Sequence, residues 1–195
     1  NPADATANDS TWTSSGAGGE TWTINGEAFV NTTDYAAVLF NSGVYLETTT
    51  GQNVSQPTTV FVVMKPVEAA PAASMKFLDV KSDTNERVQL LTENTDGDKY
   101  SIGMGGAPII MTAAYDNDMH VMSAHFNSDA TTKLIIDNMG SVVGDGGSHT
   151  VWDFTTLGAD YSGSSIYHGV VYELVVFDSA LTDAEAGTIR NHLLT

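Results

Sequence analysis

The stretch HGVVYELVVFDSALTDAEAG, residues 168–187, decides the fold. Its first part, residues 169–177, is rich in β-branched and aromatic side chains, which favour a β-strand. A turn follows, and then Thr182 stands three residues before Glu185, which is the pattern of a capping box at the start of a helix. One apolar stripe runs along this helix, made of Ala186, Ile189 and Leu193. We therefore expect a long strand followed by one short helix.

The strand over residues 169–177 should present two different faces, because successive side chains point to opposite sides. One face is wholly apolar, and we expect it to lie in the core: Val170, Tyr172, Leu174 and Val176. The other face carries Glu173 and should be partly wet. Leu181 and Ala186 occupy the positions of a hydrophobic staple. We expect the helix to lie against a sheet edge and to cover it.

The rest of the chain repeats the strand pattern and has little other helical signal. Short runs rich in Val, Ile, Thr, Tyr and Phe are each bounded by Gly, Asn, Asp or Pro, which is typical of strands joined by turns. They predict twelve strands, near residues 28–30, 36–40, 44–47, 58–65, 75–80, 86–93, 98–103, 108–113, 119–127, 132–137, 151–157 and 166–177. So many short strands with turn signals between them predict a sandwich or a jelly roll.

Three segments carry more specific signals. The run TTVFVVMKP (58–66) is almost continuously apolar, as expected of a strand that is buried on both faces. The pair Asp96-Gly97 lies between two strand-like runs and predicts a tight hairpin. The segment KLIIDNMGSVV (133–143) predicts a second hairpin.

Composition limits the classes of function. The chain has 195 residues, enough for one domain with a sizeable core, and it contains no internal repeat or linker. Its 24 acidic and 7 basic residues give a formal net charge of -17, which repels nucleic acids and could attract divalent cations. Because there is no cysteine, disulfides, thiolate zinc sites and cysteine nucleophiles are excluded. No apolar run reaches the ~18 residues of a membrane span. We expect no nucleic-acid partner and no membrane insertion.

The order of the segments resembles the laminin G-like, or concanavalin A-like, jelly-roll superfamily. Members commonly show a Leu-Gly-Ala strand end, then a strand with a glutamate between apolar positions, then a capped helix start. Here these pieces are residues 157–159, residues 169–177, and Leu181 and Thr182 with Glu185. Further segments that resemble strands of that superfamily are QPTTVFVVMKP (56–66), DMHVMSAHF (118–126) and TTKLIIDNMG (131–140).

The resemblance covers about residues 12–193 and implies an all-β fold. Two antiparallel sheets of about six or seven strands each would stack as a jelly-roll sandwich, with one short C-terminal helix. We expect a single domain over residues 1–195, in which residues 1–20 form an irregular N-terminal segment. The chain begins at Asn1 without a methionine, which indicates a processed product or an excised domain. The fold implies no particular activity, because it carries lectins, carbohydrate-binding modules, glucanases, lyases and viral surface proteins.

The sequence lacks the catalytic motifs of this fold. A retaining glycosidase needs two carboxylates about 5 Å apart, and glucanases place them on one strand as E-x-D-x-x-E, which does not occur here. The segment DTNERVQL (83–90) resembles the arginine-containing strand of alginate lyases only faintly. His120 and His125 are five residues apart, so a regular strand turns them to opposite faces, where they cannot share a metal. We expect a protein without enzymatic activity.

Calcium is the cofactor that the resemblance suggests, since jelly-roll lectins and laminin G-like domains often use it. A hard cation takes several carboxylate and carbonyl oxygens. Two acidic loops offer them, one with Asp96 and Asp98 and the other with Asp116 and Asp118. The predicted hairpin turn is an alternative explanation for Asp96. Both loops remain candidate calcium sites.

A glycan site needs flat aromatic faces beside polar groups. The loop LGADYSGSS (157–165) is long and polar, and loops at the rim of a sandwich commonly bind ligands. The candidate ligand-binding residues in or near it are Trp152, Asp160, Tyr161 and Tyr167. For Trp152 the alternative is a place in the core, within the apolar run VWDF.

Two interpretations of function stay open. The first is a non-catalytic extracellular recognition or adhesion module that binds glycan on a surface, with calcium as an aid. The second is a structural protein of a phage or virus surface, a decoration or fibre component that uses the jelly roll as a rigid block. A polysaccharide hydrolase or lyase is a less favoured third. We expect a location outside the cell or on the virion surface, and a glycan or protein surface as partner: capsid, fibre or cell envelope. In either interpretation the protein could form oligomers.

Overall fold

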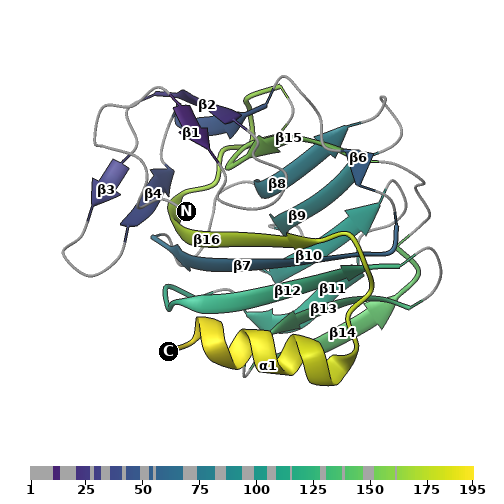
Figure 1. Cartoon of the computed structure of the whole chain (residues 1–195). Helices are drawn as coiled ribbons and strands as arrows, with labels where there is room; N and C mark the ends of the chain where they lie inside the picture. The colour runs from purple at the N-terminus through teal and green to yellow at the C-terminus, as the bar shows by residue number, and fades with distance from the viewer. Residues whose placement is uncertain are drawn as a thin grey trace.

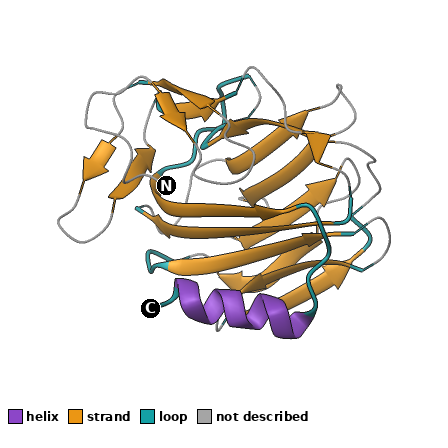
Figure 2. Cartoon of the chain, viewed as in Figure 1, coloured by secondary structure: helices purple, strands orange, loops and turns teal. Residues whose placement is uncertain are grey.

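A computed structural model of the chain describes residues 11–13, 21–26, 29–31, 36–40, 43–48, 53–54, 56–67, 74–81, 87–93, 99–104, 109–114, 116–127, 131–137, 139–146, 152–160 and 162–195. Two β-sheets lie face to face, and one helix, α1 (Asp183–Leu193), lies across the outer side of one of them (Figures 1 and 2). All pairings between the named strands are antiparallel. The predicted sandwich with one short helix is confirmed.

The nine-stranded sheet has the pairing order β1 (Thr11–Thr13), β2 (Thr21–Asn25), β5 (Tyr45–Glu47), β15 (Trp152–Leu157), β8 (Met75–Lys81), β9 (Arg87–Glu93), β10 (Lys99–Met104) and β11 (Ile109–Ala114), and β6 (Asn53–Val54) pairs with β15 off this path. The seven-stranded sheet has the order β14 (Gly140–Gly144), β13 (Thr132–Ile136), β12 (His120–Phe126), β7 (Thr58–Pro66), β16 (Gly169–Phe177), β4 (Ala36–Phe40) and β3 (Phe29–Asn31). Strands far apart in sequence are therefore neighbours in both sheets, which is the mark of a jelly roll rather than a simple meander.

All twelve predicted strands are present, and four further strands are β1, β2, β6 and β14. Of these, β14 is the second arm of the hairpin predicted over residues 133–143, with Ile136 opposite Gly140. The other predicted hairpin pairs Glu93 with Lys99, although its turn lies outside the described residues. Strand β1 corrects the expectation that residues 1–20 are wholly irregular, since it pairs with β2.

The core fills the space between the two sheets and includes a chain of aromatic rings. The ring of Tyr167 lies 6.2 Å from that of Phe40, on the seven-stranded sheet, and 4.2 Å from that of Phe77, on the nine-stranded sheet. Phe77 in turn stacks on Tyr100, at 6.2 Å. All four side chains are fully buried. Each such burial removes a large apolar surface from water, a contribution of about 2–3 kcal/mol per side chain.

Strand β7 is buried on both faces, as its apolar run predicts. Val60, Val62 and Met64 face the core between the sheets. Of the alternate residues, Phe61 and Val63 face outward and are buried as well, whereas Lys65 is exposed. Buried apolar side chains therefore lie on the outer side of β7 too.

The simple alternation expected for β16 is wrong. A register shift against β7 between Val171 and Glu173 marks a β-bulge, and a bulge adds one residue that breaks the alternation. Val171 lies in the core and Leu174, three residues on, packs against it. Val176, expected in the core, is 37% exposed, whereas Glu173 is exposed as predicted.

The helix also differs from expectation in its place. Its capping box between Thr182 and Glu185 is formed, as predicted. However, α1 packs over β12, which lies inside the seven-stranded sheet and not at its edge (Figure 1). Val121 of β12 and its register partner Val63 of β7 are buried and face outward, so apolar surface inside the sheet favours this placement over an edge.

Candidate ligand-binding face

The outer side of the nine-stranded sheet is polar and carries one aromatic ring. Val44 and Leu46 point into the core, so Tyr45 and Glu47 between and beyond them must point outward. The same alternation in β2 turns Thr23 outward, and the register pairs Thr23 with Glu47. We call Thr23, Tyr45 and Glu47 together the Tyr45 face. Tyr45 and Glu47 are half-buried and Thr23 is exposed.

Polar residues continue in the same register across the sheet. Glu47 pairs with Thr156 of β15, and Thr156 pairs with Asp79 of β8. Leu157 and Leu78, the neighbours of these two residues, belong to the core, so Thr156 and Asp79 face outward. Both are nevertheless buried, with Thr156 3% and Asp79 0% exposed. The row thus runs from an exposed flank at Thr23 to a buried polar centre.

The loop that follows β15 packs against the Tyr45 face. A Cβ atom added at Gly163 would lie 2.8 Å from the Tyr45 hydroxyl oxygen, so the loop backbone touches the ring. The loop is tied to β8 by the Lys76 N–H, which donates to the Ser165 carbonyl at 2.9 Å. Gly163 has a φ of +74°, which glycine adopts without strain. Contact with the Gly163 backbone limits the orientations open to the Tyr45 ring.

Asp160 organises this loop from within. One carboxylate oxygen of Asp160 accepts hydrogen bonds from the backbone N–H groups of Ser162 and Ser164 and from the Ser162 hydroxyl, and the other accepts from the Ser164 hydroxyl. Partial burial alone would raise the pKa of Asp160, but the hydrogen bonds from Ser164 and Ser162 outweigh it and hold the pKa below its ordinary value. The carboxylate is therefore ionised at neutral pH and works mainly as a loop brace.

The predicted rim site is brought together only in part. Asp160 lies in the loop as expected, but Tyr167 is fully buried in the aromatic core and offers no exposed ring to a glycan. Trp152 is the first residue of β15, and its side chain lies outside the described residues, as does all of Tyr161. Tyr45 was missed because its segment was assigned no facing direction. The alternation Val44, Tyr45, Leu46 is the signal that could have found it.

Of the predicted calcium ligands, Asp96 and Asp98 lie outside the described residues. Asp116 and Asp118 are placed, and one carboxylate oxygen of Asp116 accepts from the Asp118 N–H at 2.8 Å. The same oxygen lies 2.6 Å from Nε2 of His120. Within the described part of the chain, no group of three or more His, Cys, Asp or Glu side chains is arranged to hold a metal ion.

His120 instead bridges two carboxylates, a cluster that sequence reasoning did not find. Its Nδ1 lies 3.0 Å from Asp137, in the turn after β13, while Nε2 faces Asp116, in the loop before β12. Burial disfavours charge on the ring, but the hydrogen bonds with Asp137 and Asp116 outweigh it and raise the pKa of His120. This His120 bridge ties two loops at one end of the sandwich together. As predicted, His125 lies on the opposite face of β12.

No family model and no curated protein matches the sequence. Solved structures do match in fold. Domain 4 of AbnA, a GH43 extracellular arabinanase from Geobacillus stearothermophilus, solved in complex with arabinotriose, shares 16% identity over 87% of each chain, with a TM-score of 0.65. A heptameric SAP-like pentraxin from Limulus polyphemus shares 12% identity over 87% of this chain and 81% of that one, with a TM-score of 0.58.

The receptor-binding domain of a botulinum neurotoxin C/D mosaic serotype is a third structural match. It shares 13% identity over 92% of this chain and 48% of that one, with a TM-score of 0.69. At such identities the similarity shows the fold alone. The chain therefore has the β-sandwich architecture of these domains.

Proposed function

We propose that the chain is a non-catalytic recognition module that binds glycan through the Tyr45 face, outside the cell or on a virion surface. The observation that carries the proposal is the outward-facing Tyr45 ring, with Glu47 two residues along the same strand and Thr23, the register partner of Glu47, on the adjacent strand. A flat ring stacks on the apolar face of a sugar, while carboxylate and hydroxyl groups bond its hydroxyls. The similarity to a domain solved with arabinotriose supports this choice of ligand class.

The absence of catalysis is part of the same proposal. Hydrolysis of a glycoside needs two carboxylates free to act on the sugar. In the Tyr45 face the register brings Glu47 opposite Thr23 and Thr156, and the next acid along this row, Asp79, is fully buried. The carboxylate oxygens of Asp160, the acid of the adjacent loop, accept four hydrogen bonds from donors within that loop. Binding without turnover fits these surroundings.

The net charge of -17 narrows the ligand further. Sulfated or uronate-rich glycans would approach a surface of like charge and lose affinity. We therefore expect neutral sugars. No helix in the described part of the chain is long and apolar enough to cross a bilayer.

The test is titration calorimetry with arabinotriose, together with an array of neutral glycans, with and without a chelator. We expect Tyr45→Ala to weaken binding of the best ligand at least tenfold, about 1.4 kcal/mol, because the stacking ring is lost. Tyr45→Phe should keep most of the affinity. A chelator-sensitive signal would support calcium assistance, and a chelator-insensitive one would remove calcium from the proposal.

Tyr172→Ala is the matched control, because Tyr172 is also a half-buried strand tyrosine but lies on the seven-stranded sheet. It should leave the affinity unchanged. Equal losses for both variants would point to a general effect on folding, and binding that survives Tyr45→Ala would place the ligand elsewhere. If no neutral glycan binds, the proposed function is wrong.

A further inference from the structure

A buried histidine lies beneath the start of α1. His125 faces outward from β12 and is 4% exposed. Its neighbours in the sheet register are Thr59 of β7 on one side and Lys133 of β13 on the other. Its Nε2 atom is buried and has no hydrogen-bond partner among the described residues. A buried imidazole in this state is expected to be neutral.

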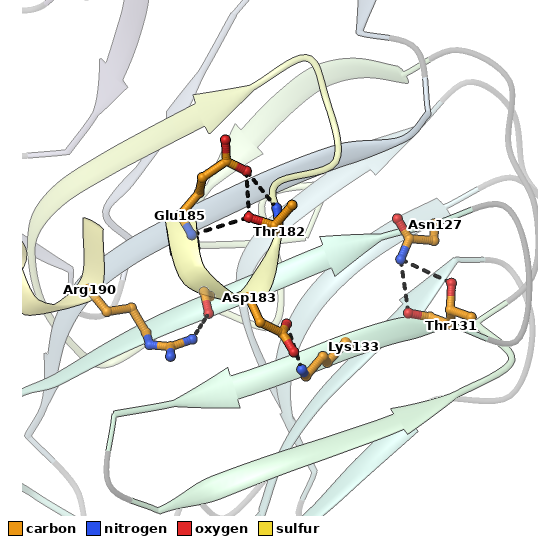
Figure 3. Close-up of polar contacts among 8 residues, drawn as sticks. Asn127, Thr131, Lys133, Thr182, Asp183, Glu185 and Arg190 are labelled. Carbon is orange, nitrogen blue, oxygen red and sulfur yellow. Dashed lines mark hydrogen bonds and ion pairs between the residues drawn. The ribbon is translucent and has the colours of Figure 1, made fainter. Parts of the chain in front are cut away.

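The segment before α1 forms a roof over this position. The Thr59 hydroxyl donates to the Ser179 carbonyl at 3.0 Å, and the Leu181 N–H lies 3.2 Å from the same hydroxyl oxygen. On the other side of His125, Lys133 donates to the Asp183 carboxylate at 2.8 Å. The chain from Ser179 to Asp183 therefore passes from one neighbour of His125 to the other. Figure 3 shows Lys133 meeting Asp183 at the start of the helix.

The surroundings of His125 oppose a positive charge. Burial comes first, and the cations Lys133 and Arg190 add to it, so the pKa of His125 lies below its ordinary value. Arg190 is held close by a 3.1 Å hydrogen bond from its guanidinium to the Ser123 hydroxyl. Asp183, the one facing carboxylate in the described part of the chain, is already bonded to Lys133. The N-terminal end of a helix, with its partial positive charge, adds further repulsion.

Few apolar side chains hold the helix to the sheet, beside its two polar contacts, Lys133 with Asp183 and Arg190 with Ser123. Ala186 is its one fully buried residue among the described side chains, and Ile189 and Leu193 are half-buried. It adds no strand to either sheet, so its departure breaks no ladder hydrogen bond. A modest change in charge beneath it can therefore shift the balance between docked and undocked states.

We propose that α1 is a lid that opens on acidification, because protonation of His125 places an unpaired charge beside Lys133 and Arg190 under the docked helix. Opening exposes His125 to water and uncovers the outer face of β12, against which α1 packs. This inference is independent of the proposed glycan function. In sign, the docked state binds fewer protons than the open state, so docking is strongest well above pH 6.5 and weakens as pH falls below it.

The chain has no cysteine, so a single introduced thiol can report opening. Ala186→Cys places it on the buried face of the lid, and Ala124→Cys places it in the core between the sheets. Labelling with 4,4′-dithiodipyridine, which reacts in acid, gives the protection of each thiol between pH 7.5 and 5. We expect the protection at position 186 to fall by up to tenfold per pH unit below about 6.5, while that at position 124 stays constant.

Adding His125→Gln to Ala186→Cys should remove this pH dependence, because glutamine fills the site without titrating. His192→Gln, at an exposed position of the same helix, should leave it in place. If His125→Gln does not fold, His125→Leu serves instead, because leucine also fills the site without titrating and should remove the pH dependence in the same way. The proposal is overturned if both thiols lose protection together, if position 186 shows no pH dependence, or if the dependence survives in the double variant that carries His125→Gln.

Discussion

At the scale of single residues, two glycines and one histidine allow the most specific predictions about stability. Gly158 follows β15, has a φ of +85°, and lies so close to Phe40 that an added Cβ would overlap its ring. The loop that braces Tyr45 begins here, so the geometry of the candidate face depends on a position that only glycine can fill.

Gly158→Ala should lower the free energy of unfolding by about 2–4 kcal/mol, because it adds backbone strain to overpacking against a buried ring. Urea denaturation of the purified variant measures this. Gly43→Ala is the control, since Gly43 has a φ of +94° but open space around it. It should cost only the strain, about 1–2 kcal/mol. Equal losses in the two variants would show that the close approach to Phe40 does not matter.

The His120 bridge should make stability depend on pH. The raised pKa of His120 means that the folded state holds a proton that the unfolded state releases earlier. The stabilisation is therefore fully present below about pH 6.5 and is lost as pH rises through the raised pKa. The lowered pKa of Asp116 sets the acid limit, because its contribution is lost as pH falls below 3.8.

His120→Gln should reduce the free energy of unfolding by about 1–3 kcal/mol at pH 6, because Asp137 loses a hydrogen-bonded partner. Urea unfolding of both proteins from pH 6 to 9 should show the difference shrinking as pH rises. A difference that is constant with pH would mean that His120 is neutral in the fold and that the bridge carries no charge.

At the scale of elements, local sequence determines where α1 begins, and tertiary packing determines which surface it covers. The Glu185 carboxylate accepts from both the Thr182 N–H and its hydroxyl, which closes the predicted capping box (Figure 3). The sequence pattern located this start correctly. It could not say which surface the helix would cover, because that depends on Val63 and Val121 being paired on strands remote from each other in sequence.

Thr182→Ala should weaken the helix by about 1 kcal/mol, the usual value of an N-cap. Hydrogen exchange of the α1 amides should then become about fivefold faster, while exchange in β7 stays unchanged. Thr188→Ala is the matched control, since the Thr188 hydroxyl only bonds back to the Ala184 carbonyl within the helix. Exchange that is unchanged in Thr182→Ala, or equally faster in both variants, would contradict the capping role.

Local sequence patterns likewise predict some strands and miss others. Strong alternation or continuous apolar runs predicted twelve of them, and β7 matched its predicted burial on both faces. Short polar strands such as β1 and the small-residue strand β14 were missed as separate strands, since their segments carry few large side chains. The bulge in β16 has no local glycine or proline signal, so alternation alone misplaced Val176.

At the scale of the whole molecule, the candidate face is made by pairing between distant strands. Tyr45 lies on β5, Thr23 lies on the neighbouring strand β2, and the loop around Gly163 contacts the Tyr45 side chain. A sequence scan that looks for aromatic residues in polar loops therefore found Tyr167, which packs inside, and passed over Tyr45. Facing directions assigned strand by strand recover Tyr45 and Glu47, but their contact with the loop follows only from the fold.

The proposed glycan-binding face and the proposed lid lie on different sheets of the sandwich. The Tyr45 face lies on the outer side of one sheet, and the α1 lid lies on the outer side of the other. The core, crossed by the aromatic chain through Tyr167, lies between them, and undocking of α1 breaks no ladder hydrogen bond of either sheet. We expect acid opening of α1 to leave glycan affinity at the Tyr45 face nearly unchanged.

Amide chemical-shift mapping during titration with arabinotriose, or with the best neutral glycan from the array, tests the central claim most directly. The account predicts that the largest shifts fall on Thr23, Tyr45, Glu47 and Gly163, and that they vanish in Tyr45→Ala. Shifts centred on α1 and the seven-stranded sheet, or saturable binding that leaves the Tyr45 face unperturbed, would contradict it.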